Sequence, residues 1–188
     1  MEVVIDSCVI SSANDQKPYD IHSSNSRQVL NVILENKHII AVSAPILTEY
    51  GCIQTRYGII WLAIMRRKKR MRRIDNVADD NLRDYLRKCT KEKYHVSQYQ
   101  NIFRKIEEDI HLLETALKSQ HLIISNEKNC RDKIRVVVAN NASSKQLEKL
   151  RKLVWIRPIE NYDITDVIIL IKKGYIIKLH QNFRLILN

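Results

Sequence analysis

Short runs of branched apolar residues alternate along this chain with segments whose apolar residues recur every three or four positions. The runs are too short for helices and rich in Val and Ile, which is typical of buried strands. They cover residues 2–5, 38–42, 121–124 and 154–156. The helically spaced segments between them are residues 23–35, 45–53, 96–119 and 143–152. This alternation predicts an α/β sandwich.

Two segments depart from the alternation. Residues 58–95 read as long helical stretches crowded with Arg and Lys and interrupted near residues 75–80 by residues typical of helix caps, so we expect a basic helical arm or insertion. In residues 159–188, which we treat as a C-terminal extension, Asp163 is placed to cap a helix ending near Lys173, and residues 175–187 read as edge strands. The length and the 45% hydrophobic content suit a single domain over residues 1–188.

The positive charge is concentrated in one place. Residues 66–73 supply seven positive charges, while the rest of the chain carries +4 of the net +11. In a helix, seven cations would surround the whole circumference and repel one another without a partner, which favours contact with nucleic-acid phosphates over a solvated face. A nuclear localisation signal and an acidic protein partner are the alternatives. The cations are Arg66, Arg67, Lys68, Lys69, Arg70, Arg72 and Arg73.

Other classes of protein are disfavoured by composition. Only three glycines occur, so there is no glycine-rich phosphate loop. The four cysteines lie far apart, without the spacing of a zinc site, and are expected to be reduced. No signal peptide precedes the first strand and no apolar run reaches the roughly 20 residues of a membrane span. We therefore expect a cytoplasmic protein without a membrane partner.

Four acidic residues occupy positions that suit a metal site better than a packed core. Asp6 closes the first apolar run, and Glu127 follows the run at 122–124 after two residues. Asp109 falls in the spacing of Ile106 and Leu113, and Glu49 lies within another apolar helical pattern. A lone carboxylate at such a position costs several kcal/mol, on the order of a lost hydrogen bond or more, unless it is neutralised. One shared divalent cation would neutralise all of them.

The residue types suit Mg²⁺ or Mn²⁺, which prefer carboxylate and water oxygens. Such an ion polarises a phosphate and lowers the pKa of a bound water. We expect Asp6 and Asp109 to be direct ligands, and Glu49 to be an outer ligand or a base that orients water. Glu127 would then be a weaker or second-metal ligand. The hydroxyls of Ser7 and Ser125 are expected to support the site.

Taken singly, each of these residues has a simpler interpretation. Asp6 is placed as a turn residue after a strand, and Glu127 as a first-turn acid facing a helix N-terminus. Glu49 and Asp109 would lie at a solvated boundary if the helical stripes were drawn out of phase. His111, two residues beyond Asp109, is expected to point elsewhere as a surface or packing residue. Asp132 is the reserve candidate for the fourth acid.

Four motifs resemble those of the PIN domain family of metal-dependent ribonucleases, which includes many toxins of toxin–antitoxin pairs. They are Val3-Val4-Ile5-Asp6-Ser7, Val42-Ser43-Ala44-Pro45-Ile46-Leu47-Thr48-Glu49, Asp109-Ile110-His111-Leu112-Leu113-Glu114-Thr115-Ala116-Leu117 and Leu122-Ile123-Ile124-Ser125-Asn126-Glu127. The family usually has Asp at the fourth acid and a small polar residue where this chain has Cys8. The resemblance covers residues 1–57 and 96–158.

The resemblance implies a three-layer α/β/α sandwich with a central, mainly parallel sheet. It also implies an endoribonuclease that hydrolyses RNA at a four-carboxylate Mg²⁺ or Mn²⁺ site. Two alternatives stay open: a weak or inactive PIN-like module that binds RNA or protein, and a toxin ribonuclease held by an antitoxin. A homodimer is also left open.

Overall fold

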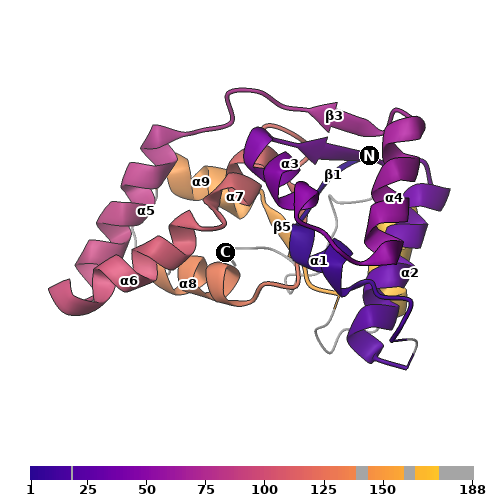
Figure 1. Cartoon of the computed structure of the whole chain (residues 1–188). Coiled ribbons are helices and arrows are strands. Elements are labelled where there is room, and N and C mark those ends of the chain that lie inside the picture. Colours follow the sequence, from indigo (N-terminus) through magenta and orange to yellow (C-terminus); the bar gives the residue numbers. More distant parts are fainter. Residues whose placement is uncertain (18, 139–143, 159–163, 174–188) are drawn as a thin grey trace.

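The computed structural model describes residues 1–17, 19–138, 144–158 and 164–173, and its centre is a five-stranded sheet in which every strand is parallel (Figure 1). The strands lie in the order β3-β2-β1-β4-β5. Their bounds are β1 Glu2–Ile5, β2 Ile39–Val42, β3 Met71–Arg73, β4 Leu122–Ile124 and β5 Val154–Ile156. Strands buried on both faces need continuous apolar runs, and β4 and β5 are fully buried.

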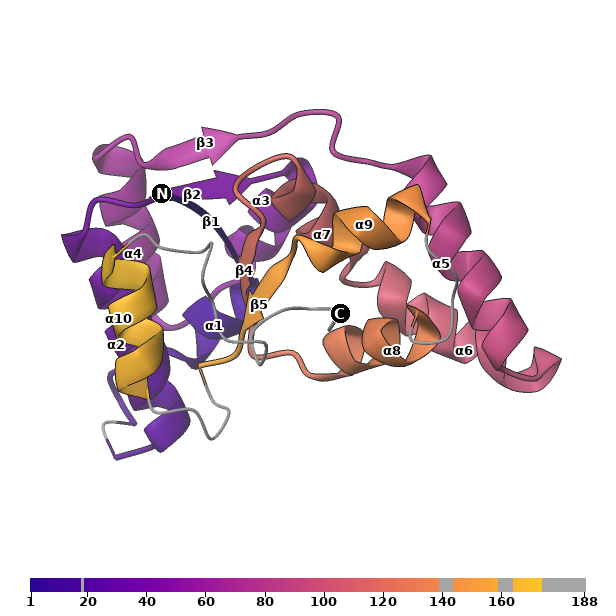
Figure 2. The same ribbon diagram turned by 180° about the vertical axis from the view of Figure 1, so that it is seen from behind.

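Helices cover both sides of the sheet. In Figures 1 and 2, α2, α4 and α10 gather at one side, and α5, α6, α8 and α9 gather at the other. Helix α7 contacts β1, β2 and β4 directly. The described helices are α1 Ser7–Ser12, α2 Ile21–Glu35, α3 Ala44–Gly51, α4 Arg56–Arg67, α5 Asp80–Lys93, α6 Val96–Glu107, α7 Ile110–Leu117, α8 Asn129–Val138, α9 Lys145–Arg151 and α10 Ile164–Lys173. The expected α/β architecture with a parallel central sheet is confirmed.

The order of the strands places a switch point beside β1. From β1 the chain moves outward to β2 and β3, then returns to the other side of β1 to form β4 and β5. The register pairs Val3 with Ile40 and Ile5 with Ile124, so the carboxyl ends of β1 and β4 lie level. In open α/β sheets, ligands bind in the crevice beyond the carboxyl ends at such a point.

The sequence led us to expect a helix through the basic run at 66–73, but the structure has a helix end, a turn and a strand there. Helix α4 ends at Arg67, and Lys69 adopts a left-handed backbone with φ of 54°. The amides of Lys69 and Arg70 bond to the carbonyls of Arg66 and Met65, a pairing that closes a helix C-terminus. The chain then pairs Met71–Arg73 with β2 as β3. The expectation of helix through residues 58–95 is therefore wrong at 71–73.

The long helix expected over residues 96–119 is also wrong, because it is two helices. Helix α6 ends at Glu107, and α7 begins at Ile110 with Asp109 as its N-cap residue, at φ −114° and ψ 4°. Aspartate is favoured at N-caps, but the Asp109 side chain accepts no capping hydrogen bond from α7. The break changes the phase of the following residues, so Asp109 does not share one continuous helix face with Leu113.

The C-terminal extension is described only in part. Helix α10 packs against α2, and its Ile171 carbonyl lies 2.7 Å from Nε2 of the buried His38. Asp163 and residues 175–187, for which we expect a cap and edge strands, lie outside the described residues. Among the described helices, none has both the length and the apolar character needed to cross a membrane.

Candidate functional site

Asp6 is fixed at the carboxyl end of β1, beside the switch point. Its amide donates to the carbonyl of Ile124 at 2.9 Å, which continues the sheet by one residue. Its Oδ1 accepts a hydrogen bond from the amide of Cys8 at 2.9 Å, and its Oδ2 accepts one from the Ser125 hydroxyl at 2.6 Å. Asp6 thus caps α1 while remaining almost fully buried at 6% exposure. The backbone of Asp6 is extended and leads into α1, so it is an N-cap residue and not the turn residue of the simpler interpretation.

Glu127 lies on the neighbouring strand connection. Its amide donates to the Ser125 hydroxyl at 2.9 Å, so one serine contacts both Asp6 and the backbone at Glu127. Its Oε1 accepts from the amide of Asn129, the first residue of α8, at 2.7 Å. The carboxylate therefore also stabilises a helix N-terminus, which was the simpler interpretation of this residue.

Glu49 and His111 form a contact that the sequence did not predict. Nε2 of the buried His111 lies 2.9 Å from Oε1 of the partly buried Glu49, within the distance of an ion pair when the histidine is protonated. Burial raises the pKa of Glu49, but the contacts with His111 and Ser7 together outweigh it and the pKa is lowered. Burial lowers the pKa of His111, but the Glu49 contact and the charges of Asp109 and Asp6 raise it overall.

The expectation that His111 points away from the acids is therefore wrong. Because α7 starts at Ile110, His111 lies in the first turn of a new helix, and its orientation follows that helix. A histidine in an otherwise apolar segment, two residues beyond an N-cap aspartate, was the signal that could have placed it.

Asp109 brings the four acids into one neighbourhood. Burial raises the pKa of its carboxyl group to about 7, and the charges of Asp6 and Glu127 act in the same direction. Glu49 adds a smaller repulsion, while the charge of His111 opposes it. No described residue donates a hydrogen bond or forms an ion pair with this carboxylate. Asp109 is thus a partly buried acid whose neighbouring charges are mostly negative.

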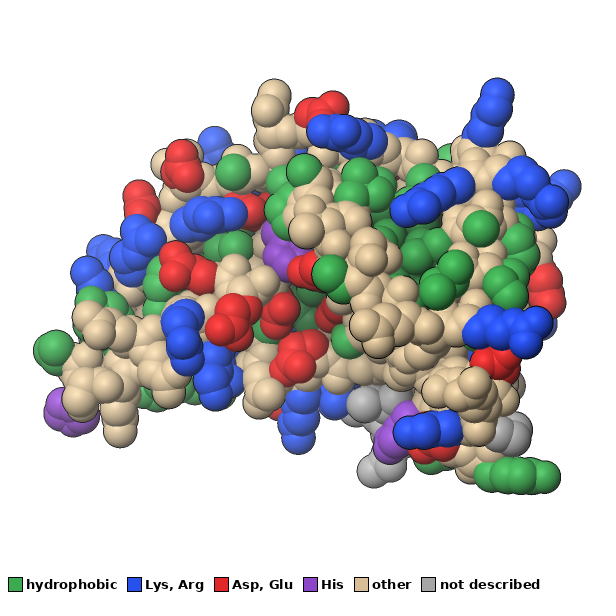
Figure 3. Space-filling view, viewed as in Figure 1, with side chains coloured by type: hydrophobic (Ala, Val, Ile, Leu, Met, Phe, Trp, Pro, Cys, Tyr) green, Lys and Arg blue, Asp and Glu red, His purple; other side chains and the backbone are tan. Residues whose placement is uncertain are grey.

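Figure 3 shows acidic side chains gathered near the middle of one face, around a histidine. The two nearby thiols differ chemically from the acids. Burial, followed by the neighbouring carboxylates, raises the pKa of Cys8 and of Cys130, so both stay protonated. A protonated thiol is not a metal ligand, which leaves a set of oxygen donors that suits Mg²⁺ or Mn²⁺.

The residue types suit a metal ion, but their side chains are not arranged around one position. Within the described residues, no three His, Cys, Asp or Glu side chains converge closely enough to hold an ion. Three of the four carboxylates have an oxygen in contact with a protein group: Asp6 with Ser125, Glu49 with His111, and Glu127 with Asn129. A metal would require a shift of these side chains.

Asp132, the reserve candidate, is engaged elsewhere. Its carboxylate pairs with Arg131 at 3.2 Å and with Lys128 at 3.9 Å, and it is not among the charges that raise the pKa of Asp109.

The cations of residues 66–73 divide into two groups. Arg70 donates to the Leu34 carbonyl at 2.6 Å, Arg73 pairs with Asp75 at 2.8 Å, and Arg72 pairs with Glu2. The other four are exposed and have no partner among the described residues. They lie at the end of α4 and in the turn that leads into the amino end of β3. The Arg70 carbonyl, at the end of this turn, accepts a hydrogen bond from the amide of Ile40 near the start of β2. The four are Arg66, Arg67, Lys68 and Lys69.

This turn and the acids therefore lie at opposite ends of the strands. Arg70 is level with the start of β2, and Asp6 follows the end of β1. Arg70 is level with Glu2, four residues before Asp6, so the separation along the strands is about 13 Å at roughly 3.3 Å per residue.

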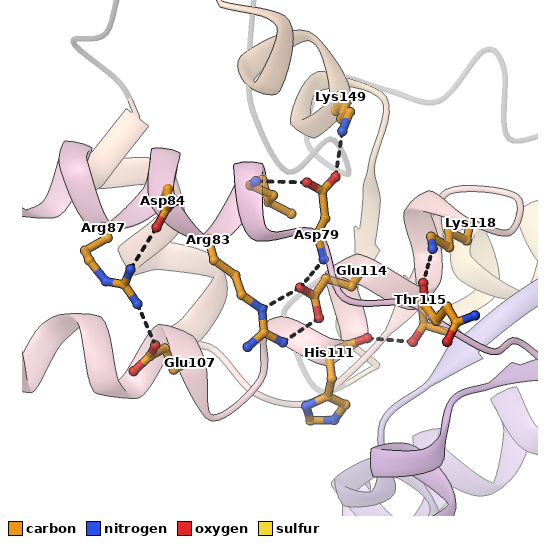
Figure 4. Close-up of polar contacts among 12 residues, drawn as sticks. Asp79, Arg83, Asp84, Arg87, Glu107, His111, Glu114, Thr115, Lys118 and Lys149 are labelled. Atoms are coloured by element: carbon orange, nitrogen blue, oxygen red, sulfur yellow. Dashed lines mark hydrogen bonds and ion pairs between the residues drawn. The ribbon is translucent and has the colours of Figure 1, made fainter.

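A second charged cluster joins α5, α7 and α9 and was missed in the sequence (Figure 4). Glu114, only 1% exposed, accepts from Nε and Nη2 of Arg83 at 2.7 and 2.8 Å. It also accepts from the amide of Asp79 at 2.9 Å. Asp79 caps α5 through Leu82 and pairs with Lys149 at 2.6 Å. A glutamate within the buried face of α7 was its only signal.

Comparisons with known protein families, with curated proteins and with solved structures find no match to this chain.

Proposed function

We propose that this protein is a metal-dependent endoribonuclease of PIN type, with Asp6, Glu49, Asp109 and Glu127 as its acidic site. The observation that carries the proposal is the raised pKa of Asp109, which feels the charges of the other three acids. Four carboxylates gathered in one neighbourhood are an electrostatic cost to the fold unless a cation offsets it. Functional sites are where such shifts concentrate.

The position of the acids supports the same proposal. Asp6 follows β1, and Ser125 and Glu127 follow β4, on the two strands that meet at the switch point. Each of the four sequence motifs that resemble the PIN family contains one of the four acids. The motifs with Asp6 and Glu127 lie on these two strands, so strand order and motif support the same edge of the sheet.

In this proposal Asp6 and Asp109 hold Mg²⁺ or Mn²⁺, and Glu49 and Glu127 complete the set. The ion would polarise the scissile phosphate and lower the pKa of a water. Ser125 and the Cys8 amide fix the orientation of the Asp6 carboxylate. Glu49 has a lowered pKa, so it stays ionised and can orient a water molecule by accepting its hydrogen bond, while His111 lies against its carboxylate.

RNA would reach the site with help from the basic run. The four exposed cations from Arg66 to Lys69 are suited to phosphate contact, which positions a strand without reading its bases. At about 3.4 Å per phosphate of a stacked strand, the roughly 13 Å along the sheet corresponds to about four nucleotides. Short oligonucleotides should therefore be cleaved with less help from these cations than longer ones.

One observation favours a second candidate, an inactive PIN-like module that binds RNA or protein. The acids do not converge as ligands within the described residues, and three of them already contact protein groups. A toxin held by an antitoxin remains a form of the first proposal, with the acids covered by a partner.

Cleavage of labelled RNA by purified protein decides between these candidates. Wild type is expected to cleave with Mn²⁺ or Mg²⁺ and not with EDTA, and Asp109→Asn to lose at least about a hundredfold in rate. The matched control is Glu108→Gln, which removes an exposed acid one residue away and should retain activity. Full activity in purified Asp109→Asn would exclude the proposed site, and metal-independent binding without any cleavage would favour the inactive module.

A further inference from the structure

The outer face of α4 combines exposed apolar side chains with cations. Ile59 and Ile60 are adjacent and 51% and 48% exposed, although isoleucine is one of the most often buried residues. At roughly 100° per residue, Ile59, Ile60 and Ala63 fall on one arc of about 120°. The same arc carries Arg56 before them and Arg66 and Arg67 after them. The remaining arc holds Gly58, Trp61, Leu62 and Met65, which face the core.

This face lies in a strongly positive part of the chain. Residues 50–74 contain eight Arg and Lys and no Asp or Glu. Arg56, Arg66 and Arg67 are exposed and have no partner among the described residues. Figure 3 shows hydrophobic side chains over α4 with Lys and Arg side chains around them. The positive charge of the outer face of α4 would attract an anionic partner, and the apolar centre of this face would bury apolar groups of that partner.

We propose that the outer face of α4 docks an acidic amphipathic segment of another protein. RNA phosphates can contact Arg66 and Arg67, as proposed above, but they gain nothing from Ile59 and Ile60, so a protein segment fits the whole face better. A helix that lays apolar residues over these isoleucines and carboxylates beside Arg56, Arg66 and Arg67 satisfies both. The 12 residues of α4 offer about 18 Å of surface, which matches three turns of a partner helix.

Other occupants fit the charge less well. A second copy of this chain brings another +11, which opposes association. The chain's own residues 174–188 contain no Asp or Glu, so they cannot provide the complementary charge. The surface is separate from the acidic site, and the inference does not depend on catalysis.

The probe is a set of three stapled helical peptides of about 16 residues, measured by fluorescence anisotropy with purified protein. The first has Leu at helical spacing on one face and Glu beside it. The second has the same composition in scrambled order, and the third has Lys in place of Glu. We expect the first to bind at least about tenfold more tightly than the second, because only it can bury leucines and pair charges together. The third should not bind.

Variants of the protein test whether the peptide uses this face. Ile59→Asn with Ile60→Asn should weaken the first peptide at least about tenfold, since it removes the apolar centre of the face, and because both side chains are about half exposed we expect the variant to stay folded. The matched control is Val96→Asn, which removes an 81% exposed apolar residue from α6 and should leave binding unchanged. Arg66→Gln with Arg67→Gln should weaken binding and reduce its dependence on salt.

Several results would overturn the proposal. Equal binding of the ordered and scrambled peptides would mean that charge alone is responsible. Unchanged binding in the isoleucine variant would place the peptide elsewhere. If an RNA strand loses affinity in the isoleucine variant to the same extent, the face belongs to RNA. A dimer in light scattering that dissociates in this variant would assign the face to a second copy.

Discussion

Helix α7 carries two acids whose surroundings are opposite. Glu114 is buried and meets a guanidinium with two hydrogen bonds and a backbone amide, so its charge is offset within the protein. Asp109, at the start of the same helix, meets other carboxylates, and no described residue pairs with it. The first acid joins α7 to α5. The second imposes a cost that an additional ligand could remove, which is the pattern of a functional site.

The largest effect should come from removing the partner of Glu114. Arg83→Met leaves a buried carboxylate without its guanidinium, and we expect a loss of about 3 kcal/mol of unfolding free energy. Urea denaturation measures it. Lys88→Met, on the same helix, loses only an exposed pair with Glu92 and should change stability by less than about 1 kcal/mol. Equal effects would mean that Glu114 does not depend on Arg83 and would remove the contrast with Asp109.

Replacing Asp109 should act in the opposite direction. Its pKa is about 7 in the folded protein against an ordinary value of 3.8, so between these pH values the folded state holds a proton that the unfolded state has lost. Stability is therefore lost as pH rises from about 4 through about 7. Asp109→Asn should be more stable than wild type by about 1–2 kcal/mol at pH 8 after solvent screening, and no more stable at pH 4. A pH-independent difference would contradict this.

Glu127→Gln should lower the pKa of Asp109, because it removes a negative charge while keeping an oxygen that can accept from Asn129. A carboxyl NMR titration of Asp109 measures this shift, and Asp132→Asn, whose charge is already paired, should leave it unchanged. In cleavage, Glu127→Gln should weaken metal affinity or rate, whereas Glu127→Asp should retain or improve activity. Wild-type rates for the Gln variant would remove Glu127 from the site.

The smallest effect should come from the cations of the basic turn, and we expect to see it in how RNA affinity depends on salt. Each single-strand phosphate contact contributes about 0.7 to the slope of log affinity against log salt, so four exposed cations contribute at most about 2.8. Replacing Arg66, Arg67, Lys68 and Lys69 with Gln should flatten the slope by up to this amount and weaken different RNA sequences alike. Replacing Lys88, Lys91, Lys93 and Lys105 is the control. If only the control set matters, RNA is bound along α5 and α6.

The sequence predicted the strands at the centre of the sheet well, because strands buried on both faces need short continuous runs of residues such as Val and Ile. It also predicted Asp6 at the end of a strand. It failed where a single backbone position decides the outcome: the left-handed Lys69 turned an expected helix into β3, and the N-cap at Asp109 divided α6 from α7. Because the break at Asp109 was not expected, the sequence did not predict the contact of His111 with Glu49. Because the turn at Lys69 was not expected, part of the basic run was predicted as a helix and not as β3.

The pairing of Glu114 with Arg83 could not be predicted, since it joins residues 31 positions apart in sequence on different helices. Periodicity reports which face of a helix is buried but not what it meets there. The sequence therefore predicted that acids would be buried, but not which of them would find a cation.

The arginines of β3 have a consequence that needs no ligand. Met71–Arg73 is the outermost strand at one end of the described sheet, and Arg72 and Arg73 project from it into solvent. Charged side chains on an outer strand prevent its free backbone groups from pairing with a strand of another molecule. Arg72 and Arg73 therefore help to keep the protein from aggregating, and a variant that loses them should be examined for self-association.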